Sequence, residues 1–254
     1  MRLGALLGPI VQSTTGASSR FLAEQARTFE DEGFDSLWSV QAIGRGFAIT
    51  DPFIALAIAA AATESVEIGT AVVQVPLYHP VDLAHRVFSL MQVCGDRFLF
   101  GVGAGSTQKD FDALGRDYTT RFSTFSQRVT ELRRIFADGK LDDVELSPWP
   151  AVRGGPPMLL GAWSGSGVER AARTYSGWIA SAAYRSPAEV ISALQRFRAA
   201  GGRRAVVSTI QLGPTTDLGA TRAMLNEFAC AGFDDAVVML LPGGPSPGNV
   251  RRLI

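Results

Sequence analysis

The chain is poor in the residues that build metal sites and disulfide frameworks. Its 254 residues include only two cysteines and two histidines. His79 and His85 are too few for a three-histidine site, and no Cys-x-x-Cys or His-Glu-x-x-His spacing replaces them, so we expect no bound metal. Cys94 and Cys230 both stand in apolar helical patterns, which predicts two buried thiols in a reducing compartment.

An excess of charge and a long apolar run are also missing. The 24 basic and 24 acidic residues cancel, so the chain lacks the field that attracts nucleic acid or an anionic membrane, and we expect neither partner. The longest apolar run, Phe53–Ala62, is well short of the ~20 residues that cross a bilayer. Gly8 and Pro9 interrupt the apolar start, which argues against a secretory signal. These absences predict a cytoplasmic protein.

What the chain does contain is a regular alternation of short apolar runs and longer amphipathic stretches. The predicted strands are Arg2–Leu7, Ser36–Val40, Val66–Val75, Phe98–Val102, Pro157–Gly161, Gly177–Ala180, Arg204–Ile210 and Ala236–Leu241. The predicted helices are Ser19–Glu32, Pro52–Thr63, Pro80–Val93, Arg121–Asp138, Gly167–Tyr175, Pro187–Ala200 and Thr216–Ala231, before a weak final segment, Asn249–Ile254. Such alternation indicates parallel strands joined by helices. We therefore expect a single (β/α)₈ barrel domain over residues 1–254, with an open doubly wound sheet as the competing fold.

Local signals support helix–strand units of this kind. Glu32-Gly33-Phe34-Asp35 precedes the second predicted strand, and Ala231-Gly232-Phe233-Asp234 precedes the last. Both read as a helix end, a glycine cap, an apolar anchor and a polar turn. Two connections are long: Ala104–Thr120 follows a strand and should lie on the face where barrel sites form, whereas Gly139–Gly155 precedes one and is expected to be structural decoration.

Two segments rich in small residues end predicted strands. The glycines of Gly101–Thr107 (GVGAGST) do not have the dinucleotide-binding spacing; they either let the strand turn or present a flat surface to a planar ring or a phosphate. Gly161–Gly167 (GAWSGSG) leads into a helix, whose N-terminus either holds a phosphate or is merely capped by the loop.

Titratable groups suited to catalysis are scarce. Gln74 is a polar side chain near a strand end and a candidate ligand contact, and His79, next to Pro80, is expected to cap or pack a helix. We find no paired carboxylates at strand ends and no Ser/His/Asp set. Any chemistry is therefore expected to come from a cofactor.

The stretch Ser65–Ser106 (SVEIGTAVVQVPLYHPVDLAHRVFSLMQVCGDRFLFGVGAGS) closely resembles the luciferase-like flavin monooxygenase superfamily, especially the branch that uses the deazaflavin coenzyme F-420. Ala23–Trp38, Tyr118–Gly139 and Pro156–Ile179 agree with the same family in order and spacing. The resemblance implies a barrel, usually dimeric, with a planar cofactor at its C-terminal face. It also implies a non-prolyl cis peptide between Ala71 and Val72. The chain departs from many relatives in its C-terminal helix, which is reduced to Asn249–Ile254.

The cofactor contacts that the resemblance implies fall on three strand ends. They are Ala71, Val72 and Gln74 on the third strand, Ala104, Gly105, Ser106 and Thr107 after the fourth, and Ala162, Trp163, Ser164, Gly165 and Ser166 in the phosphate loop. The implied cofactor is coenzyme F-420 in preference to FMN, and the implied partners are a small-molecule substrate and a second copy of the chain.

The chain departs from the family where acid/base groups are expected. Ser39, Val40, Gln41 and Ala42 stand where many relatives carry an acidic residue and a histidine, and Ser106 stands where sugar-phosphate dehydrogenases of the branch carry a glutamate. We therefore assign no catalytic residue and do not carry that substrate over.

Three functions stay open at this point. The first is an oxidoreductase that uses reduced deazaflavin or FMN for hydride transfer to a small organic substrate, or for its oxygenation; hydride transfer depends mainly on proximity and orientation. The second is a catalytically inactive flavin-binding or cofactor-free barrel that serves as a carrier or scaffold. The third is a non-redox barrel enzyme that acts on a phosphorylated metabolite.

Overall fold

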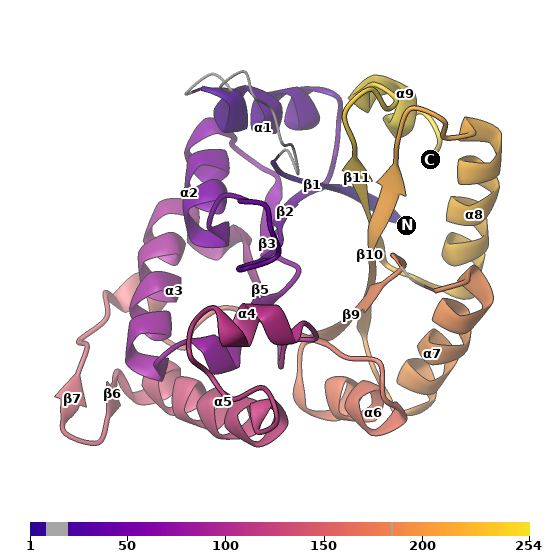
Figure 1. Cartoon of the computed structure of the whole chain (residues 1–254). Helices are drawn as coiled ribbons and strands as arrows, with labels where there is room; N and C mark the ends of the chain where they lie inside the picture. Colours follow the sequence, from indigo (N-terminus) through magenta and orange to yellow (C-terminus); the bar gives the residue numbers. More distant parts are fainter. Residues whose placement is uncertain (9–19, 184) are drawn as a thin grey trace.

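A computed structural model of the chain describes residues 1–8, 20–183 and 185–254. Eight parallel strands form a closed barrel inside a ring of helices (Figure 1). They are β1 (Arg2–Leu6), β2 (Ser36–Ser39), β3 (Glu67–Thr70), β5 (Phe98–Gly103), β8 (Met158–Gly161), β9 (Gly177–Ser181), β10 (Arg204–Leu212) and β11 (Asp235–Leu240). Because β1 pairs with β11 and β3 pairs with β5, the sheet has no open edge. The predicted barrel is confirmed, and the open sheet is excluded.

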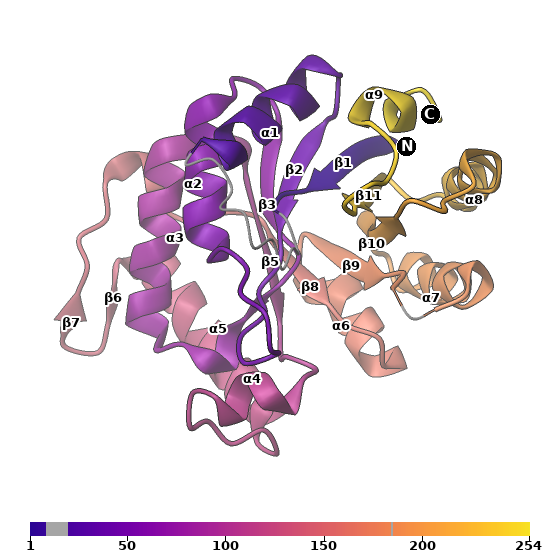
Figure 2. The same cartoon turned by 45° about the horizontal axis from the view of Figure 1, so that its top comes forward.

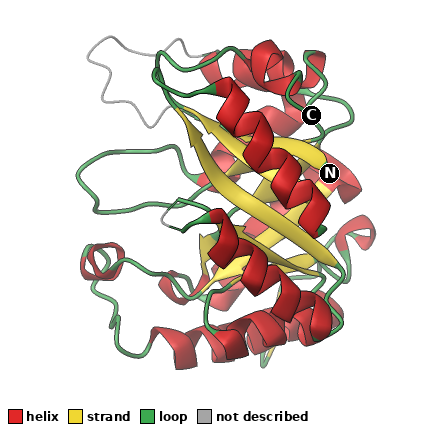
Figure 3. Cartoon of the chain, turned by 90° about the vertical axis from the view of Figure 1, so that its right-hand side faces the viewer, coloured by secondary structure: helices red, strands yellow, loops and turns green. Residues whose placement is uncertain are grey.

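Helices cover the outside of the strands (Figure 3). The long ones are α1 (Phe21–Asp31), α2 (Pro52–Ala62), α3 (Pro80–Cys94), α5 (Arg121–Asp138), α6 (Gly165–Thr174), α7 (Pro187–Ala199) and α8 (Leu218–Ala231), and the short ones are α4 (Gln108–Asp112) and α9 (Pro247–Arg251). Their bounds agree with the predicted ones to within a few residues, because capping side chains mark several starts: Asp51 caps α2, and Ser186 with Glu189 forms a capping box on α7. Ser19, the expected start of the first helix, lies outside the described residues.

The repeated tetrapeptide has the same structure at both sites. Gly33 and Gly232 end α1 and α8 with φ angles of 84° and 101°, which glycine adopts without a steric penalty. The aspartate that ends each motif accepts a hydrogen bond from the backbone of a neighbouring strand: Asp35 from Leu3 at 2.8 Å, and Asp234 from Ala205 at 2.7 Å. The motif thus ties a helix end to two strands.

Charged side chains close the N-terminal end of the barrel. The Arg204 guanidinium bonds both oxygens of Asp235, at 2.8 and 3.0 Å, and both oxygens of Glu67, at 3.1 and 2.6 Å. Arg2 bonds Glu67 as well. Above this layer the interior is apolar, filled by Leu6, Trp38, Leu99, Leu159, Ile179, Val206, Val237 and Met239. A ligand therefore has to approach from the C-terminal end, as in other barrels of this type.

The predicted third strand, Val66–Val75, is not continuous. β3 ends at Thr70, a cis peptide joins Ala71 to Val72 as the resemblance implied, and the two-residue β4 (Val73–Gln74) resumes pairing with β5. A 3₁₀ turn, Val75–Leu77, then leads to α3. Hydrophobic periodicity does not reveal the break, because the residues on either side of it, from Ile68 to Val73, are apolar or small.

Both long connections contain short elements. Ala104–Thr120 includes α4, and Gly139–Gly155 includes the hairpin β6 (Lys140–Leu141) and β7 (Val144–Glu145), followed by a 3₁₀ turn, Pro150–Val152. A further 3₁₀ turn, Gly95–Arg97, precedes β5. The hairpin projects at the outer edge of the molecule, beyond α3 and α5 (Figure 1).

The two cysteines differ in exposure. Cys94 is buried as predicted, but Cys230 is exposed, so the prediction of two buried thiols is wrong for Cys230. α8 buries Thr221, Leu225 and Phe228, and Cys230 lies off that face. Over the described residues, no helix has both the length and the apolar character needed to cross a membrane, and no cluster of three or more potential ligands is placed to hold a metal ion.

Candidate cofactor site

The three segments predicted to contact a cofactor meet at neighbouring strand ends. β4 pairs with β5, and β5 pairs with β8. Val72 lies where they converge: a Cβ atom on Gly103 would come within 2.7 Å of its side chain, and one on Gly161 within 2.9 Å. The glycine-rich strand ends therefore leave room for the segment that follows the cis peptide.

The mouth of the barrel is apolar. Val40, Ala71, Val72 and Leu241 are partly buried and pack on the interior cluster. An apolar floor with a few polar groups at its rim is the usual construction of a site for a planar organic ligand.

Gln74 is a polar residue at the end of β4, close to this mouth. Its side chain is almost fully buried, and Nε2 donates a 2.7 Å hydrogen bond to Asp110. Its Oε1 atom is buried and has no hydrogen-bond partner. Oε1 faces Gly105, whose φ angle is 85° and where a Cβ atom would come within 2.6 Å of it. Because an unpaired buried acceptor costs free energy, this oxygen is suited to receive an N–H group from a ligand.

Asp110 anchors a polar network that the sequence analysis missed. Its carboxylate is fully buried and accepts hydrogen bonds from Arg45, through Nε at 2.9 Å and Nη2 at 2.5 Å, and from the Ile43 backbone at 3.1 Å. Burial acts to raise the pKa of Asp110, but the bonds from Arg45 and Gln74 outweigh it, so the pKa lies below its usual value. In sequence Asp110 is one acid among several in a polar connection, and nothing there signals its partner 65 residues away.

Gln41 lies at the end of the second strand, where the resemblance led us to expect acid/base groups, and its amide bonds other residues of the chain. Nε2 donates to the Tyr78 hydroxyl at 2.6 Å, and Oε1 accepts from the Gln74 backbone at 2.8 Å. Burial, with a contribution from Asp51, raises the pKa of Tyr78 to about 12, so the phenol stays neutral at ordinary pH. Gln41 links the ends of the second and third strands and supplies no acid or base.

The expected phosphate loop, Ala162–Ser166, both caps a helix and leaves its N-terminus open. The Ser164 hydroxyl accepts from the Gly167 backbone at 3.1 Å, so this serine is the N-cap of α6. Gly165 follows it at the first helical position, and a Cβ atom built there would meet nothing within 4 Å. The first backbone N–H groups of a helix have no partner inside it, and they attract anions. Capping and phosphate binding, which the sequence left as alternatives, are thus compatible.

Other predicted residues lie around this centre. Trp163 packs edge-on against Trp178, with ring centroids 6.1 Å apart, and the Arg185 guanidinium lies 5.0 Å from its ring. Ser106 is exposed, and its carbonyl accepts from the Tyr118 hydroxyl at 3.0 Å. Ala104 is partly buried against the outer core, and Thr107 begins α4 without a side-chain cap. His79 caps α3 by accepting from the Val81 backbone at 3.3 Å, as expected.

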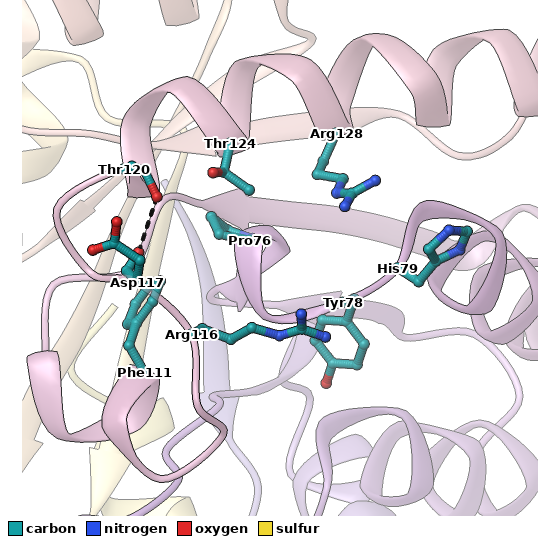
Figure 4. A pocket seen from close by; sticks show the side chains of 9 residues that line it. All are labelled: Pro76, Tyr78, His79, Phe111, Arg116, Asp117, Thr120, Thr124 and Arg128. Carbon is teal, nitrogen blue, oxygen red and sulfur yellow. Dashed lines mark hydrogen bonds between the residues drawn. The ribbon is translucent and has the colours of Figure 1, made fainter.

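A cavity of about 200 Å³ lies beside the mouth and outside the predicted contacts (Figure 4). Its lining comes from the turn before α3, from α4 and the connection after it, and from α5: Pro76, Tyr78, His79, Phe111, Arg116, Asp117, Thr120, Thr124 and Arg128. Positive and negative groups both line it, since Arg116 and Arg128 are offset by Asp117 and by Glu131, which pairs with Arg128 at 3.0 Å. Because these charges balance, the cavity favours neither an anionic nor a cationic ligand. We therefore place the candidate cofactor site at the strand ends and not in this cavity.

Comparison with known proteins identifies the family of the chain. Residues 1–227 match the family described as luciferase-like monooxygenase. The chain belongs to that family. A curated relative, the alkanal monooxygenase alpha chain of Photorhabdus luminescens, is 29% identical over 164 residues, which are 61% of this chain and 45% of that protein. The present chain therefore spans less than half the length of this luciferase-like relative.

Solved structures of other proteins share the barrel. An F-420-dependent secondary alcohol dehydrogenase, in complex with an F-420–acetone adduct, superposes with a TM-score of 0.79 at 14% identity, covering 100% of this chain and 98% of that one. The oxygenating constituent of 3,6-diketocamphane monooxygenase from Pseudomonas putida, in complex with FMN, has a TM-score of 0.68 at 18% identity, covering 92% and 80%. At these identities the likeness establishes the fold alone, and the two structures hold different cofactors.

Proposed function

We propose that this chain is a luciferase-like oxidoreductase that binds reduced coenzyme F-420, or alternatively FMN, at the C-terminal mouth of its barrel. The bound cofactor would supply a hydride to a small organic substrate or, in the case of FMN, activate dioxygen for its oxygenation. The family match supports this assignment, and the resemblance to the deazaflavin branch favours F-420.

One observation carries the proposal: an apolar mouth and an open helix N-terminus lie on neighbouring strand ends. The ring would rest on Ala71 and Val72, with Gln74 Oε1 accepting from it. The phosphate would lie at Gly165 and Ser166, held by backbone N–H groups and the α6 dipole. Ala104–Thr107 would border the ring. These groups are neutral, so the chain's own residues orient the cofactor and exclude water without moving a proton.

Titration of the purified protein with FMN and with F-420, side by side, tests the assignment. We expect quenching of cofactor fluorescence at micromolar concentration and tighter binding of F-420. Binding of neither cofactor refutes the proposal and leaves two alternatives, a cofactor-free scaffold and an enzyme that acts on a phosphorylated metabolite. Binding without turnover over a broad substrate panel favours the carrier or scaffold.

Gly165→Asp tests the phosphate position, because a carboxylate there repels the phosphate while its charge still suits the helix N-terminus. We expect cofactor binding to be lost. Ala188→Asp is the matched control, since it adds the same charge to the first turn of α7, where Ala188 is exposed. Unchanged affinity in Gly165→Asp would rule out the phosphate loop.

We also propose that the chain forms a homodimer through α2. The resemblance implies a dimer, and α2 supports it because this helix is apolar on its outer side as well: Ile54 is 57% exposed and Ile58 is 36% exposed. A helix that is apolar all round is normally covered on every side.

A further inference from the structure

Residues 41–50, which we call the strap, lead from β2 to α2 and pass beside α4 (Figure 2). The strap is fastened there by three contacts. The Ile43 backbone and the Arg45 side chain bond Asp110, and a Cβ atom on Gly44 would come within 2.8 Å of both the Ala113 side chain and the Lys109 carbonyl.

The other end of the strap reaches the barrel mouth. Ile49 and Thr50 line a small cavity of about 20 Å³ together with Leu6, Val40 and Met239, which stand at strand ends. Such a volume holds no more than about one water molecule. The strap therefore borders the apolar mouth and is held in place at α4.

Asp110 joins this strap to the third strand. Its Oδ2 atom accepts hydrogen bonds from both Arg45 Nη2 and Gln74 Nε2. A carboxylate paired with a guanidinium can only accept hydrogen bonds, so the Gln74 amide must turn its NH₂ group to Asp110. Oε1 is left pointing the other way, towards Gly105, with no partner.

We propose that Asp110 is a positioning residue that makes Gln74 present its carbonyl oxygen to the bound ring, and that the Arg45–Asp110 pair latches the strap beside it. The proposal rests on the proposed function, because it assigns an N–H group of the ring as the partner of Oε1. It selects ligands with a hydrogen-bond donor at that edge, since an acceptor there would face a second acceptor.

In the wild type, Gln74 donates a hydrogen bond and Asp110 accepts it. The test uses variants in which these two roles are exchanged. In Asp110→Asn, the new amide can donate, so Gln74 is free to turn and its NH₂ group can replace the acceptor. We expect the affinity for the cofactor that the wild type binds to fall by about tenfold or more. In the double variant Asp110→Asn/Gln74→Glu, the asparagine donates to one glutamate oxygen while the other faces Gly105, and we expect most of the affinity to return.

A purely structural role for Asp110 predicts no such rescue. Affinity unchanged in Asp110→Asn, or equally weak binding in the single and double variants, overturns the proposal. Arg134→Ala is the matched control, because it breaks an exposed pair with Asp142, 3.6 Å apart, and should bind as the wild type does.

If Asp110→Asn does not fold, Arg45→Ala is a second variant that breaks the same ion pair. Hydrogen exchange of the Ile43 backbone amide should become faster, and cofactor affinity should fall. Faster exchange with unchanged affinity would show that the Arg45–Asp110 pair does not affect cofactor binding. Unchanged exchange would show that this pair does not hold the strap in place.

A readout without cofactor separates this proposal from the proposed function. By NMR, one side-chain NH₂ proton of Gln74 should exchange slowly in the ligand-free protein and lose that protection in Asp110→Asn. A wild type that binds neither cofactor refutes the proposed function, and the Gln74 signal then decides whether Asp110 orients the amide.

Discussion

At the scale of single residues, the site depends on positions where a side chain is absent. Gly103 and Gly161 make room for Val72, and Gly105 makes room for Oε1 of Gln74. Glycine is required at these three positions for different causes. All three lack space for a Cβ atom, and Gly105 alone among them also has a positive φ angle. Substitutions can therefore separate backbone strain from steric contact.

Gly105→Ala should destabilise the protein more than Gly115→Ala. Both positions have positive φ, 85° and 60°, which costs an alanine about 1–2 kcal/mol. At Gly105 the new Cβ would also lie 2.6 Å from Gln74 Oε1 and 2.7 Å from the Phe111 ring, whereas at Gly115 it meets nothing within 4 Å. We expect an additional loss of about 1–3 kcal/mol in the free energy of unfolding, measured with denaturant. Equal losses in the two variants would show that a Cβ atom at position 105 has no steric conflict with Gln74 or Phe111.

The two thiols should react at very different rates. Burial raises the pKa of Cys94 to about 11, while Cys230 is exposed. Since the thiolate is the reactive form, iodoacetamide at about pH 8 should label Cys230 and leave Cys94 unmodified in the folded protein. Mass spectrometry of the labelled peptides measures the difference, and unfolding in urea should expose both thiols. Equal labelling of the folded protein would show that Cys94 is accessible.

At the scale of elements, helices and strands were largely predictable and the links between them were not. Caps such as Asp51 and the Ser186–Glu189 box are local, so their helix starts can be found from neighbouring residues. α4 and the break after Thr70 have no periodic signal, because one is five residues long and the other lies inside an apolar run. The predicted contacts did converge at the strand ends. Arg45 and Asp110 could not be found, because their pairing joins two different connections.

The exposed face of α2 provides the test of the dimer. Ile54→Glu/Ile58→Glu places charge on the exposed apolar ridge, which should prevent a second copy from covering it. We expect a dimer for the wild type and a monomer for the variant in analytical ultracentrifugation. Phe122→Glu on α5, where Phe122 is 59% exposed, is the control and should remain dimeric. A monomeric wild type would refute the proposed dimer.

At the scale of the whole molecule, charged side chains close one end of the barrel and apolar side chains line the other. Glu67 bonds Arg204 and Arg2 from strands that are distant in sequence, so this network holds the closed ring together at its base. Burial acts to raise the pKa of Glu67, but the bonds from the two arginines outweigh it and lower the pKa below 4.5.

This shift predicts how stability depends on pH. As pH falls, the unfolded chain takes up a proton at this position before the folded chain does. The stabilisation by Glu67 is therefore complete above about pH 4.5 and is lost as pH falls through the lower pKa of the folded state. Denaturant unfolding at a series of acidic pH values should show a smaller loss of stability in Glu67→Gln than in the wild type. If the free energy of unfolding falls with pH to the same extent in both proteins, Glu67 does not contribute to the pH dependence of stability.

The sequence by itself determined the barrel, its helix caps, the repeated Gly-Phe-Asp turn and the three strand ends that form the candidate site. These depend on periodicity, on local hydrogen bonds and on the rule that parallel strands end on one face. Only the tertiary structure decided the partner of Asp110, the orientation of the Gln74 amide, the exposure of Cys230 and the charged base of the barrel. Each of these depends on which side chains meet across the closed ring, and residues far apart in the chain carry no local signal of their neighbours.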